Sequence, residues 1–342
     1  MVTIKDVARD AGVSVGTVSN VLNGGRVSEA RRKLVEASIE KLGYQVNTLA
    51  KGMRMQKTDY VVVILPNLIN PYFALLLDAL ESELSAVGKQ VLLCLSGDDA
   101  EREVAFMDMA KQNKVDGIIG VTYSKVEEER IENMAFVSID RHYKSHIPCV
   151  AGDNWQGGWL AAENLHKRGA TNLLCFMTMS SVDSEVRKRR VGFTEYCMEH
   201  DLSCNSVEMS EKQIVSVYES YGSRKLIHNM LRAYISPSMG EHSIDGIFTS
   251  SDHLATIVQE ELEEMGKRVP EDIQIIGYDG LQFLNQGKPI VSSIAQPLHE
   301  IAKEAVRCLN ELIANGKTEG NTKIPVSFQE GPTTKTLVTE EK

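Results

Sequence analysis

A short stretch near the N-terminus carries side chains suited to reading DNA. Residues 15–20 are VGTVSN. The Asn20 carboxamide can pair with two edge groups of an adenine, whereas the hydroxyls of Thr17 and Ser19 are suited to phosphate contacts. Val15 can touch a thymine methyl group, and Gly16 completes the same outward face. The alternative for each of these residues is ordinary helix surface.

The residues around this stretch predict the element that would position it. Gly12 permits a sharp turn, and Ser14 is placed to cap a helix that begins at residue 15. Apolar residues follow helical spacing on both sides of this turn: Ile4, Val7, Ala8 and Ala11 before it, and Val15, Val18, Val21 and Leu22 after it. Two helices joined by such a turn form a helix-turn-helix motif.

A third helix is predicted directly downstream. Ser28 is a natural N-cap, and the sequence EARRKLVEASIEKLGY follows it. Its expected buried stripe consists of Leu34, Val35, Ile39 and Leu42. Three helices within about 45 residues can share one small hydrophobic core.

Charge separates this N-terminal region from the rest of the chain. Residues 1–58 contain ten Lys or Arg and five Asp or Glu, a balance of +5. Because the whole chain has a formal net charge of −10, the remainder carries −15. A basic region on an acidic protein points to a polyanionic partner for that region alone. A solvated charged face is the alternative.

Length and composition describe a protein of more than one domain. The 342 residues exceed the size of most single cores, and 42% of them are hydrophobic. No apolar run approaches the roughly 18 residues that span a bilayer, and the N-terminus lacks the apolar core of a secretory signal, so we expect a cytoplasmic protein without membrane contact. The six cysteines are scattered, which implies neither disulfides nor a metal site, and we expect no cofactor.

From residue 60 onward, short apolar runs alternate with helical stretches. One series has strand-like runs at 60–65, 90–95, 116–121 and 136–140, and a second at 172–177, 206–209, 245–250 and 273–279. Such runs are typical of parallel strands covered on both faces, so the sequence predicts two doubly wound α/β units. A helix at 298–316 and strands around 324–329 and 334–338 should thread back across both units, and a ligand is expected in the cleft at the strand ends.

Two segments give the chain a specific family resemblance. DVARDAGVSVGTVSNVLN (6–23) and VSEARRKLVEASIEKLGYQVN (27–47) resemble the headpiece of the lactose repressor (LacI/GalR) family of bacterial transcriptional regulators. The resemblance implies a DNA-binding headpiece at 1–46, a hinge at 47–58 and a periplasmic-binding-protein-like sensor at 59–342. Its N-lobe would comprise 59–157 and 291–322, and its C-lobe 158–290 and 323–338. Further implied DNA contacts are Thr3, Ser14, Asn23, Arg26, Tyr44, Asn47, Ala50 and Met53.

The expected hinge departs from the family pattern. In relatives this segment folds on operator DNA and inserts a leucine into the minor groove, and Met53 occupies that position here. Val46 replaces a usual proline, and Gly52 costs a helix about 1 kcal/mol relative to alanine. We therefore expect a hinge that is disordered without DNA and kinks DNA more weakly. Full hydrogen-exchange protection of residues 47–54 in the DNA-free protein would contradict this.

The resemblance also implies an effector site between the lobes. Relatives place an aromatic residue of PNLINPYF, an arginine three residues before a glycine, and the acid of GYDG against the effector, which here are Tyr72 or Phe73, Arg189 and Asp279. A guanidinium suits vicinal hydroxyls or a carboxylate. Ser251 replaces a usual asparagine, and Asp252 can simply cap the next helix. Five further residues lie where relatives line or rim the cleft: Asp140, Arg141, Trp155, Tyr218 and Gln296.

These observations favour a repressor over other classes of protein. The chain lacks a G-x-S-x-G elbow, a phosphate-binding glycine loop and H-E-x-x-H, so an enzyme is not expected. An exported transport receptor would have no use for a DNA-binding head. We expect a homodimer on a palindromic operator, controlled by a small-molecule effector of the chemical class of sugars. A sugar phosphate, a purine co-repressor or a phosphorylated partner protein remains the alternative, and the C-terminus lacks tetramer-forming leucine heptads.

Overall fold

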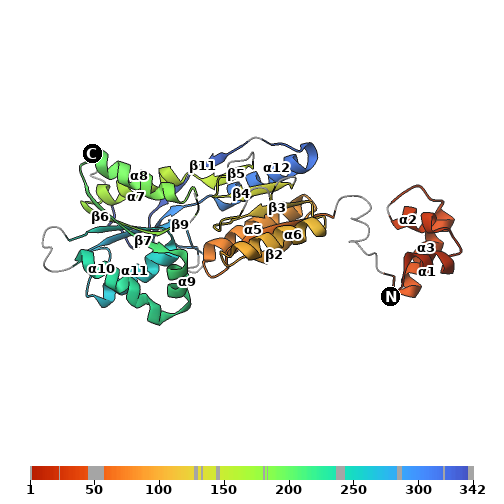
Figure 1. The fold of residues 1–342 in the computed structure, drawn as a ribbon, viewed down its shortest axis with the longest axis horizontal. Helices are drawn as coiled ribbons and strands as arrows, with labels where there is room; N and C mark the ends of the chain where they lie inside the picture. Colours follow the sequence, from red (N-terminus) through yellow and green to blue (C-terminus); the bar gives the residue numbers. More distant parts are fainter. Residues whose placement is uncertain are drawn as a thin grey trace. The chain divides into compact units, whose positions relative to one another are not determined.

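The computed structural model contains two compact units, Met1–Thr58 and Asp59–Lys342 (Figure 1). It describes residues 2–22, 24–44, 58–126, 130–131, 134–143, 147–179, 182, 184–235, 243–282, 287–318 and 320–337. The hinge expected at 47–58 lies outside these residues except for Thr58, and so do the DNA contacts expected of Asn23, Asn47, Ala50 and Met53. Among the described residues, no helix combines the length and apolar character needed to cross a bilayer.

The N-terminal unit has three helices around one small core. Helices α1 (Ile4–Asp10) and α2 (Val15–Leu22) are joined by a turn, and α3 (Glu29–Leu42) follows. Gly12 in the turn has φ = +65°, a conformation that glycine adopts without strain. The core buries Val7, Ala8, Val18, Val21 and Val35. The predicted helix-turn-helix is therefore present.

One predicted core residue of α3 is instead exposed. Leu34 is 55% exposed, whereas its neighbour Val35 is fully buried. Successive residues of a helix point about 100° apart, so a narrow buried face holds only one of two neighbours. Ser38 takes a core position on this face, and its hydroxyl donates a hydrogen bond to the carbonyl of Val7 at 3.3 Å.

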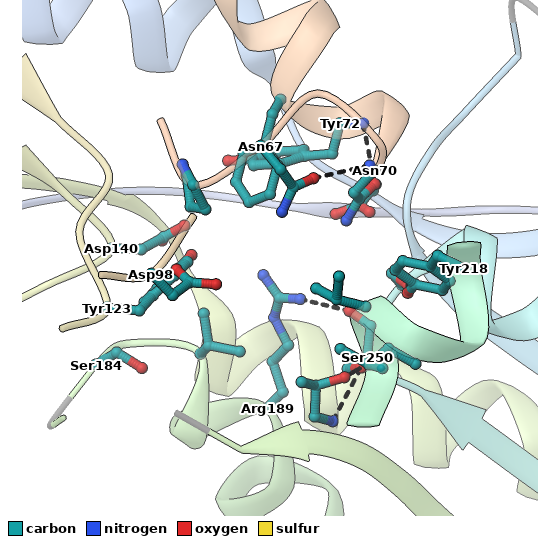
Figure 2. A pocket seen from close by; sticks show the side chains of 18 residues that line it. Asn67, Asn70, Tyr72, Asp98, Tyr123, Asp140, Ser184, Arg189, Tyr218 and Ser250 are labelled. Atoms are coloured by element: carbon teal, nitrogen blue, oxygen red, sulfur yellow. Dashed lines mark hydrogen bonds between the residues drawn. The ribbon is translucent and has the colours of Figure 1, made fainter. Parts of the chain in front are cut away.

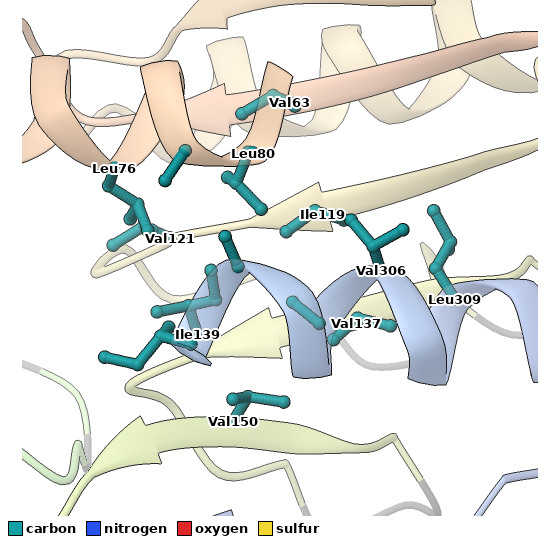
Figure 3. Close-up of a cluster of buried hydrophobic side chains, with 14 of the residues drawn as sticks. Val63, Leu76, Leu80, Ile119, Val121, Val137, Ile139, Val150, Val306 and Leu309 are labelled. Atoms are coloured by element: carbon teal, nitrogen blue, oxygen red, sulfur yellow. The ribbon is translucent and has the colours of Figure 1, made fainter. Parts of the chain in front are cut away.

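The first lobe of the larger unit is built on a six-stranded parallel sheet of order β11-β5-β4-β3-β1-β2. Its strands are β1 (Tyr60–Leu65), β2 (Gln90–Leu95), β3 (Gly117–Gly120), β4 (Phe136–Ile139), β5 (Cys149–Gly152) and β11 (Thr322–Ile324). Helices α5 (Pro71–Ala86) and α12 (Leu298–Asn315) pack on one face through a buried aliphatic cluster, and Figure 3 shows Leu76 and Leu80 of α5 with Val306 and Leu309 of α12 there. Helix α6 (Ala100–Gln112) packs on the other face.

The second lobe repeats this plan with the strand order β12-β10-β9-β8-β6-β7. Its strands are β6 (Asn172–Met179), β7 (Ser203–Ser210), β8 (Gly246–Thr249), β9 (Gln274–Asp279), β10 (Ser292–Ala295) and β12 (Ser327–Gln329), of which only β12 is antiparallel to its neighbour. Helices α7 (Asn154–Lys167) and α8 (Arg187–Glu199) cover one face. Helices α9 (Glu211–Glu219), α10 (Lys225–Ile235) and α11 (Asp252–Glu264), with the short helix η2 (Tyr221–Arg224), cover the other (Figure 1).

The chain passes between the lobes after β5, after β10 and after β11. These crossings differ from the expected lobe boundaries. Helix α7 begins at Asn154 and packs entirely on the second sheet, and β10 pairs with β9 rather than joining the first lobe. Strand β5 was not predicted, since Val150 is the only β-branched or aromatic residue in its sequence CVAG. The strand predicted at 334–338 is also not found over the described residues 334–337.

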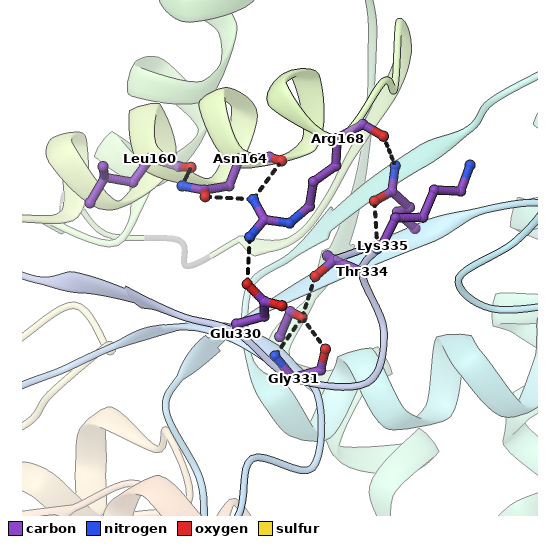
Figure 4. Close-up of polar contacts among 9 residues, drawn as sticks. Leu160, Asn164, Arg168, Glu330, Gly331, Thr334 and Lys335 are labelled. Carbon is purple, nitrogen blue, oxygen red and sulfur yellow. Dashed lines mark hydrogen bonds and ion pairs between the residues drawn. The ribbon is translucent and has the colours of Figure 1, made fainter. Parts of the chain in front are cut away.

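The C-terminal segment is held to the second lobe by polar contacts instead of a strand ladder. The Arg168 guanidinium, at the end of α7, donates to Asn164 at 2.8 Å and to Glu330 at 3.0 Å (Figure 4). The Thr333 hydroxyl donates to the Ile275 carbonyl at 2.7 Å, and the Thr333 carbonyl accepts from the Ile275 N–H. Thus β11 adds to the first sheet and β12 to the second, as expected of a tail that threads across both lobes.

Candidate functional site

The outward face of α2 is open to solvent, as a DNA-reading surface requires. Val15, Gly16 and Asn20 are exposed, and Thr17 and Ser19 are half-buried. Ser14 caps the helix, because its hydroxyl oxygen accepts from the Thr17 N–H at 3.1 Å. This cap holds the first turn of α2, which carries most of the predicted base and phosphate contacts.

The other described DNA-contact residues have different local roles. Thr3 is exposed at the start of α1, and its hydroxyl and N–H both donate to the Asp6 carboxylate, at 2.6 and 3.0 Å. These two hydrogen bonds lower the pKa of Asp6. Arg26 is exposed between α2 and α3, whereas Tyr44 packs partly against the headpiece core. Arg26 is therefore open to a phosphate contact, whereas both donors of Thr3 are held by Asp6.

In the larger unit, a pocket lies where the carboxyl ends of both sheets meet (Figure 2). Loops after β1, β2, β3 and β4 supply the first-lobe wall, and the ends of β6, β8 and β9 with the start of α8 supply the second. This is the place at which open α/β sheets bind ligands. The pocket is lined by Pro66, Asn67, Asn70, Tyr72, Phe73, Asp98, Tyr123, Asp140, Thr178, Ser184, Val186, Arg189, Ile214, Val215, Tyr218, Ser250, Ser251 and Asp279.

Seven of the ten predicted effector residues line this pocket: Tyr72, Phe73, Asp140, Arg189, Tyr218, Ser251 and Asp279. The other three do not. Arg141 turns into the first lobe, where it donates to the Ser124 carbonyl at 2.6 Å and to the Thr122 hydroxyl. Trp155 is 36% exposed on the outer side of α7, and its indole N–H donates to Glu195. Gln296 reaches the pocket only through Asp279, to which its amide donates at 2.9 Å.

Residues that sequence reasoning missed form much of the polar lining, namely Asn67, Asn70, Asp98, Tyr123, Thr178, Ser184 and Ser250. Four of the seven lie within three residues of a strand end: Asn67 after β1, Asp98 after β2, Tyr123 after β3 and Ser250 after β8. Since ligands bind beyond the carboxyl ends of parallel strands, polar residues at these positions were a usable signal.

The neighbouring Ser251 and Asp252 divide their roles in an unexpected way. Ser251, not Asp252, caps α11, since its hydroxyl oxygen accepts from the Leu254 N–H at 3.1 Å. Asp252 is fully buried and accepts from the Ser293 hydroxyl at 2.6 Å and the Leu281 N–H at 2.7 Å. Asp252 therefore supports the second-lobe strands behind the pocket and does not line it.

Arg189 is the best-supported side chain of the pocket. Its Nε donates to the Asn154 carboxamide oxygen at 2.6 Å and one terminal nitrogen donates to the Ser250 carbonyl at 2.7 Å. The guanidinium also lies over the Tyr278 ring, 3.5 Å from its centroid. Figure 2 shows the group pointing into the cavity. Asn154 also donates to Asp140 at 3.4 Å, and thereby joins the arginine of one lobe to an acid of the other.

Three aspartates give the pocket an acidic character. Asp98, Asp140 and Asp279 have φ angles of +57°, +62° and +117°, a region that side chains other than glycine rarely occupy outside functional sites. Burial raises the pKa of each of them, that of Asp98 to about 6. Among the lining residues, the guanidinium of Arg189 is the single group of opposite charge to these three carboxylates.

Several buried polar atoms of the pocket have no hydrogen-bond partner among the residues that the structure describes. They are the Tyr72 hydroxyl, one carboxylate oxygen each of Asp98 and Asp279, and the Ser184 hydroxyl. Buried polar atoms are normally hydrogen-bonded, because leaving one unpaired costs about 1–3 kcal/mol. Their collection around one cavity indicates that a bound ligand supplies the partners.

An ionic cluster beside the pocket ties the two lobes together. The Glu185 side chain is 1% exposed and contacts His142 and Lys323 of the first lobe and Lys188 in the first turn of α8. The Lys323 ammonium lies 3.9 Å from the carboxylate. The Glu185 N–H also donates to the Asp140 carbonyl at 2.8 Å, so the pocket wall and this cluster share a backbone link.

One group of potential metal ligands occurs within the described part of the chain. Donor atoms of His228, Glu261 and Glu264 lie within 4.8 Å of one another on α10 and α11. His228 and Glu261 already hydrogen-bond each other at 3.1 Å, which accounts for their proximity. The group lies outside the pocket lining.

Comparison with known proteins connects both units to one family. Residues 3–47 match the family model of bacterial regulatory proteins of the lacI family, and residues 162–334 match that of a periplasmic binding protein-like domain. The chain is 33% identical over 332 residues to the sucrose operon repressor of Pediococcus pentosaceus, covering 96% of this chain and 98% of that protein. This chain belongs to the LacI family of bacterial regulatory proteins.

Other relatives of this LacI-family protein agree. The ribose operon repressor of Halalkalibacterium halodurans is 32% identical to this chain. The match covers 90% of this chain and 89% of that repressor. The Lac repressor dimer bound to operator and the anti-inducer ONPF shares the fold, with a TM-score of 0.80 at 23% identity. The match covers 97% of this chain and 98% of that one. A LacI-type regulator from Alkaliphilus metalliredigens QYMF, complexed with D-xylulofuranose, gives a TM-score of 0.69 at 26% identity over 81% of this chain and 100% of that one.

Family membership confirms the class of protein predicted from the sequence. The chain is a LacI-type transcriptional repressor with a helix-turn-helix headpiece and a periplasmic-binding-protein-like sensor, and it is not an enzyme. The individual contacts to DNA and effector stay predictions.

Proposed function

We propose that this LacI-family repressor binds a palindromic operator as a cytoplasmic homodimer and is controlled by an unphosphorylated sugar in the interlobe pocket. The observation that carries the choice of effector is the charge of the pocket, three carboxylates against one guanidinium. Relatives named as sucrose and ribose operon repressors, and one solved with D-xylulofuranose, support the same class.

The pocket chemistry favours a neutral polyol over an anion. Sugar hydroxyls donate to Asp98, Asp140 and Asp279, and their oxygens accept from Arg189. A phosphate cannot donate to these carboxylates, and its charge would meet theirs at low dielectric. The rings of Tyr72 and Phe73, with centroids 5.4 Å apart, supply an apolar surface for a sugar face.

The DNA side of the proposal rests on the outward face of α2. Asn20 would read an adenine edge in the major groove and Val15 a thymine methyl, while Thr17, Ser19 and Arg26 would hold phosphates. Two such headpieces in a dimer match the two half-sites of a palindrome.

Effector control follows from the placement of the pocket. Because its walls come from both lobes, a bound sugar stabilises the arrangement that closes the lobes on it. DNA affinity then changes by the difference in effector affinity between the two arrangements. We expect the sugar to lower DNA affinity and relieve repression. Co-repression, in which the effector raises DNA affinity, is the alternative.

The first experiment is a thermal-shift panel of neutral sugars, sugar phosphates and purines on the full-length protein. A neutral sugar should raise the melting temperature, since a ligand at a hundred times its Kd adds about 2.7 kcal/mol of stability. A shift produced only by a phosphorylated sugar or a purine would overturn the proposed effector class.

Arg189→Ala tests the pocket itself. The variant should lose the sugar-induced change in operator affinity and still bind operator, as measured by fluorescence anisotropy on labelled duplex. The loss of a charged hydrogen-bond donor should weaken sugar binding by about 2 kcal/mol or more. The matched control is Arg190→Ala, because Arg190 points outward and pairs with Glu208. Normal induction in Arg189→Ala would remove this pocket as the effector site.

A further inference from the structure

The Glu185 carboxylate is buried where the two lobes meet, beside the effector pocket. Its neighbours along the chain, Ser184 and Val186, both line the pocket, whereas Glu185 is not among the lining residues. The Glu185 side chain is 1% exposed. A carboxylate with so little access to water is costly to bury unless partner groups stabilise its charge. These partners therefore decide what Glu185 contributes.

Side chains from both lobes contact this carboxylate. From the first lobe, Nε2 of His142 contacts Oε1, and the Lys323 ammonium lies 3.9 Å from Oε2. At that distance the Lys323 contact is an electrostatic attraction rather than a hydrogen bond. From the second lobe, the Lys188 ammonium contacts Oε1. Burial acts to raise the pKa of Glu185, but the contacts with Lys188 and His142 outweigh it and lower this pKa.

Backbone contacts join the same two segments. The Glu185 N–H donates to the Asp140 carbonyl at 2.8 Å, and Ser184 forms an isolated antiparallel bridge with Arg141. These contacts cross from the residues before α8 to the loop after β4. Main chain and side chain therefore connect the lobes at one place.

Each end of this connection is fixed within its own lobe. In the first lobe, the Arg141 guanidinium donates to the Ser124 carbonyl at 2.6 Å and to the Thr122 hydroxyl at 3.2 Å. In the second lobe, the chain continues directly from Glu185 into α8, which carries Arg189 in its first turn. Because neither end is a loose loop, movement of one lobe relative to the other must displace the Glu185 contacts.

We propose that Glu185 is an interlobe anchor, which stabilises the present arrangement of the lobes before any effector binds. Only in this arrangement does the buried carboxylate meet His142 and Lys323. Effector affinity scales with the fraction of the protein that already has the binding arrangement, so the anchor raises sugar affinity without touching the sugar. The effect on sugar affinity rests on the proposed function, whereas the effect on the lobes does not.

The first test measures lobe movement in the full-length protein with neither sugar nor DNA present. Since the Glu185 N–H donates across the lobes, its exchange with deuterium reports the breaking of that bond, and mass spectrometry with electron-transfer fragmentation resolves this amide. The Asp140 N–H, which donates to the Val150 carbonyl within the first lobe at 3.1 Å, is the internal reference. Glu185→Gln removes a charged hydrogen-bond acceptor, so the amide of residue 185 should exchange about tenfold faster and the reference should not change.

Asp116→Asn is the matched control. The Asp116 side chain is also 1% exposed and pairs with Lys89 at 2.7 Å, but both residues belong to the first lobe. This variant should lower the melting temperature and leave exchange at residue 185 unchanged. His142→Ala combined with Lys323→Met removes the first-lobe partners and should reproduce the faster exchange. Adding Glu185→Gln to that pair should change little further, because contacting groups are not additive.

Sugar affinity is the second readout, measured with a neutral sugar that raises the melting temperature of the wild type. It should weaken in Glu185→Gln by up to the same factor as the exchange rate, and it should not change in Asp116→Asn. A wild type that binds no neutral sugar would refute the proposed effector class and leave the exchange result standing. Circular dichroism confirms that each variant is folded. Wild-type exchange at residue 185 in both anchor variants, or equal acceleration in Asp116→Asn, would overturn the anchor, and faster exchange with unchanged sugar affinity would overturn its effect on binding.

Discussion

At the scale of single residues, the pocket contains buried carboxylates that are costly to ionise, and a ligand that donates hydrogen bonds to them lowers this cost. Asp98 illustrates this, because burial alone raises its pKa to about 6 and one of its oxygens has no hydrogen-bond partner within the described part of the chain. Its charge also acts on the buried Glu103, whose pKa burial raises and Asp98 raises further. The free protein therefore carries a carboxylate that is costly to ionise and ready to accept hydroxyl donors.

Asp98→Asn should make the ligand-free protein more stable at neutral pH and weaken sugar binding. A folded-state pKa above the ordinary 3.8 means that the folded protein holds this proton more tightly, so the free energy of unfolding falls as pH rises from about 4 to about 6. The variant lacks this decrease, so its free energy of unfolding at pH 7 should exceed that of the wild type by about 1–3 kcal/mol.

The measurement is chemical denaturation of both proteins from pH 4 to 7.5, with sugar affinity determined on the same samples. Wild-type affinity should increase as pH rises through about 6, because the ionised carboxylate is the better acceptor. Parallel stability curves for the two proteins across this range would exclude the assigned role of Asp98.

At the scale of elements, the crossing of α7 and α8 sets the position of Arg189. A Cβ atom on Gly158 would lie 1.8 Å from the Arg189 carbonyl oxygen, and one on Gly192 would lie 2.0 Å from the Trp155 carbonyl oxygen. The two helices therefore approach to backbone contact, which only glycine allows. This approach also lets Asn154 at the start of α7 reach the Arg189 guanidinium.

Gly158→Ala should push the helices apart and disturb the pocket. Overpacking of this kind costs about 1–3 kcal/mol of stability. The expected result is a lower melting temperature together with weaker sugar binding, measured by calorimetry. Gly222→Ala is the matched control, since its Cβ would meet only the Ser220 hydroxyl oxygen at 3.7 Å. Unchanged sugar affinity in a destabilised Gly158→Ala protein would show that the crossing serves stability alone.

At the scale of the whole molecule, we expect the proposed homodimer to pair through the β2 edge of the first lobe's sheet. Strand β2 is the sheet edge and Leu93 on it is 40% exposed, while Leu68, Ile69 and Val87 are exposed at the two ends of α5. Leu93→Lys should yield monomers in sedimentation experiments. Because a dimer engages both half-sites at once, operator affinity should fall about a hundredfold. A dimeric Leu93→Lys protein would place the interface elsewhere.

Charge asymmetry makes a further prediction at this scale. Residues 1–58 carry +5 and the remainder −15, so operator binding should depend on phosphate contacts from the headpiece alone. Operator affinity should fall by about a thousandfold between roughly 50 and 200 mM salt, as expected for several released counterions. Affinity that is flat with salt would contradict the phosphate contacts assigned to Thr17, Ser19 and Arg26.

The sequence by itself determined the elements and the class of the protein. The helix-turn-helix could be predicted because its signals are local: helical spacing, Gly12 in the turn and Ser14 as the cap. The two doubly wound lobes could be predicted because buried parallel strands leave continuous apolar runs such as residues 60–65. These patterns depend on neighbours in the chain, so they can be read without the fold. Strand β5 was not found, because its sequence CVAG contains a single β-branched residue.

Only the tertiary structure decided which side chains meet. Arg141 follows Asp140 directly, yet one turns into the lobe and the other lines the pocket, because the positive φ of Asp140 redirects the chain there. Asn154 reaches Arg189 from 35 residues away. Side-chain direction at strand ends and the approach of distant elements depend on packing between lobes and helices, for which a single sequence carries no local signal.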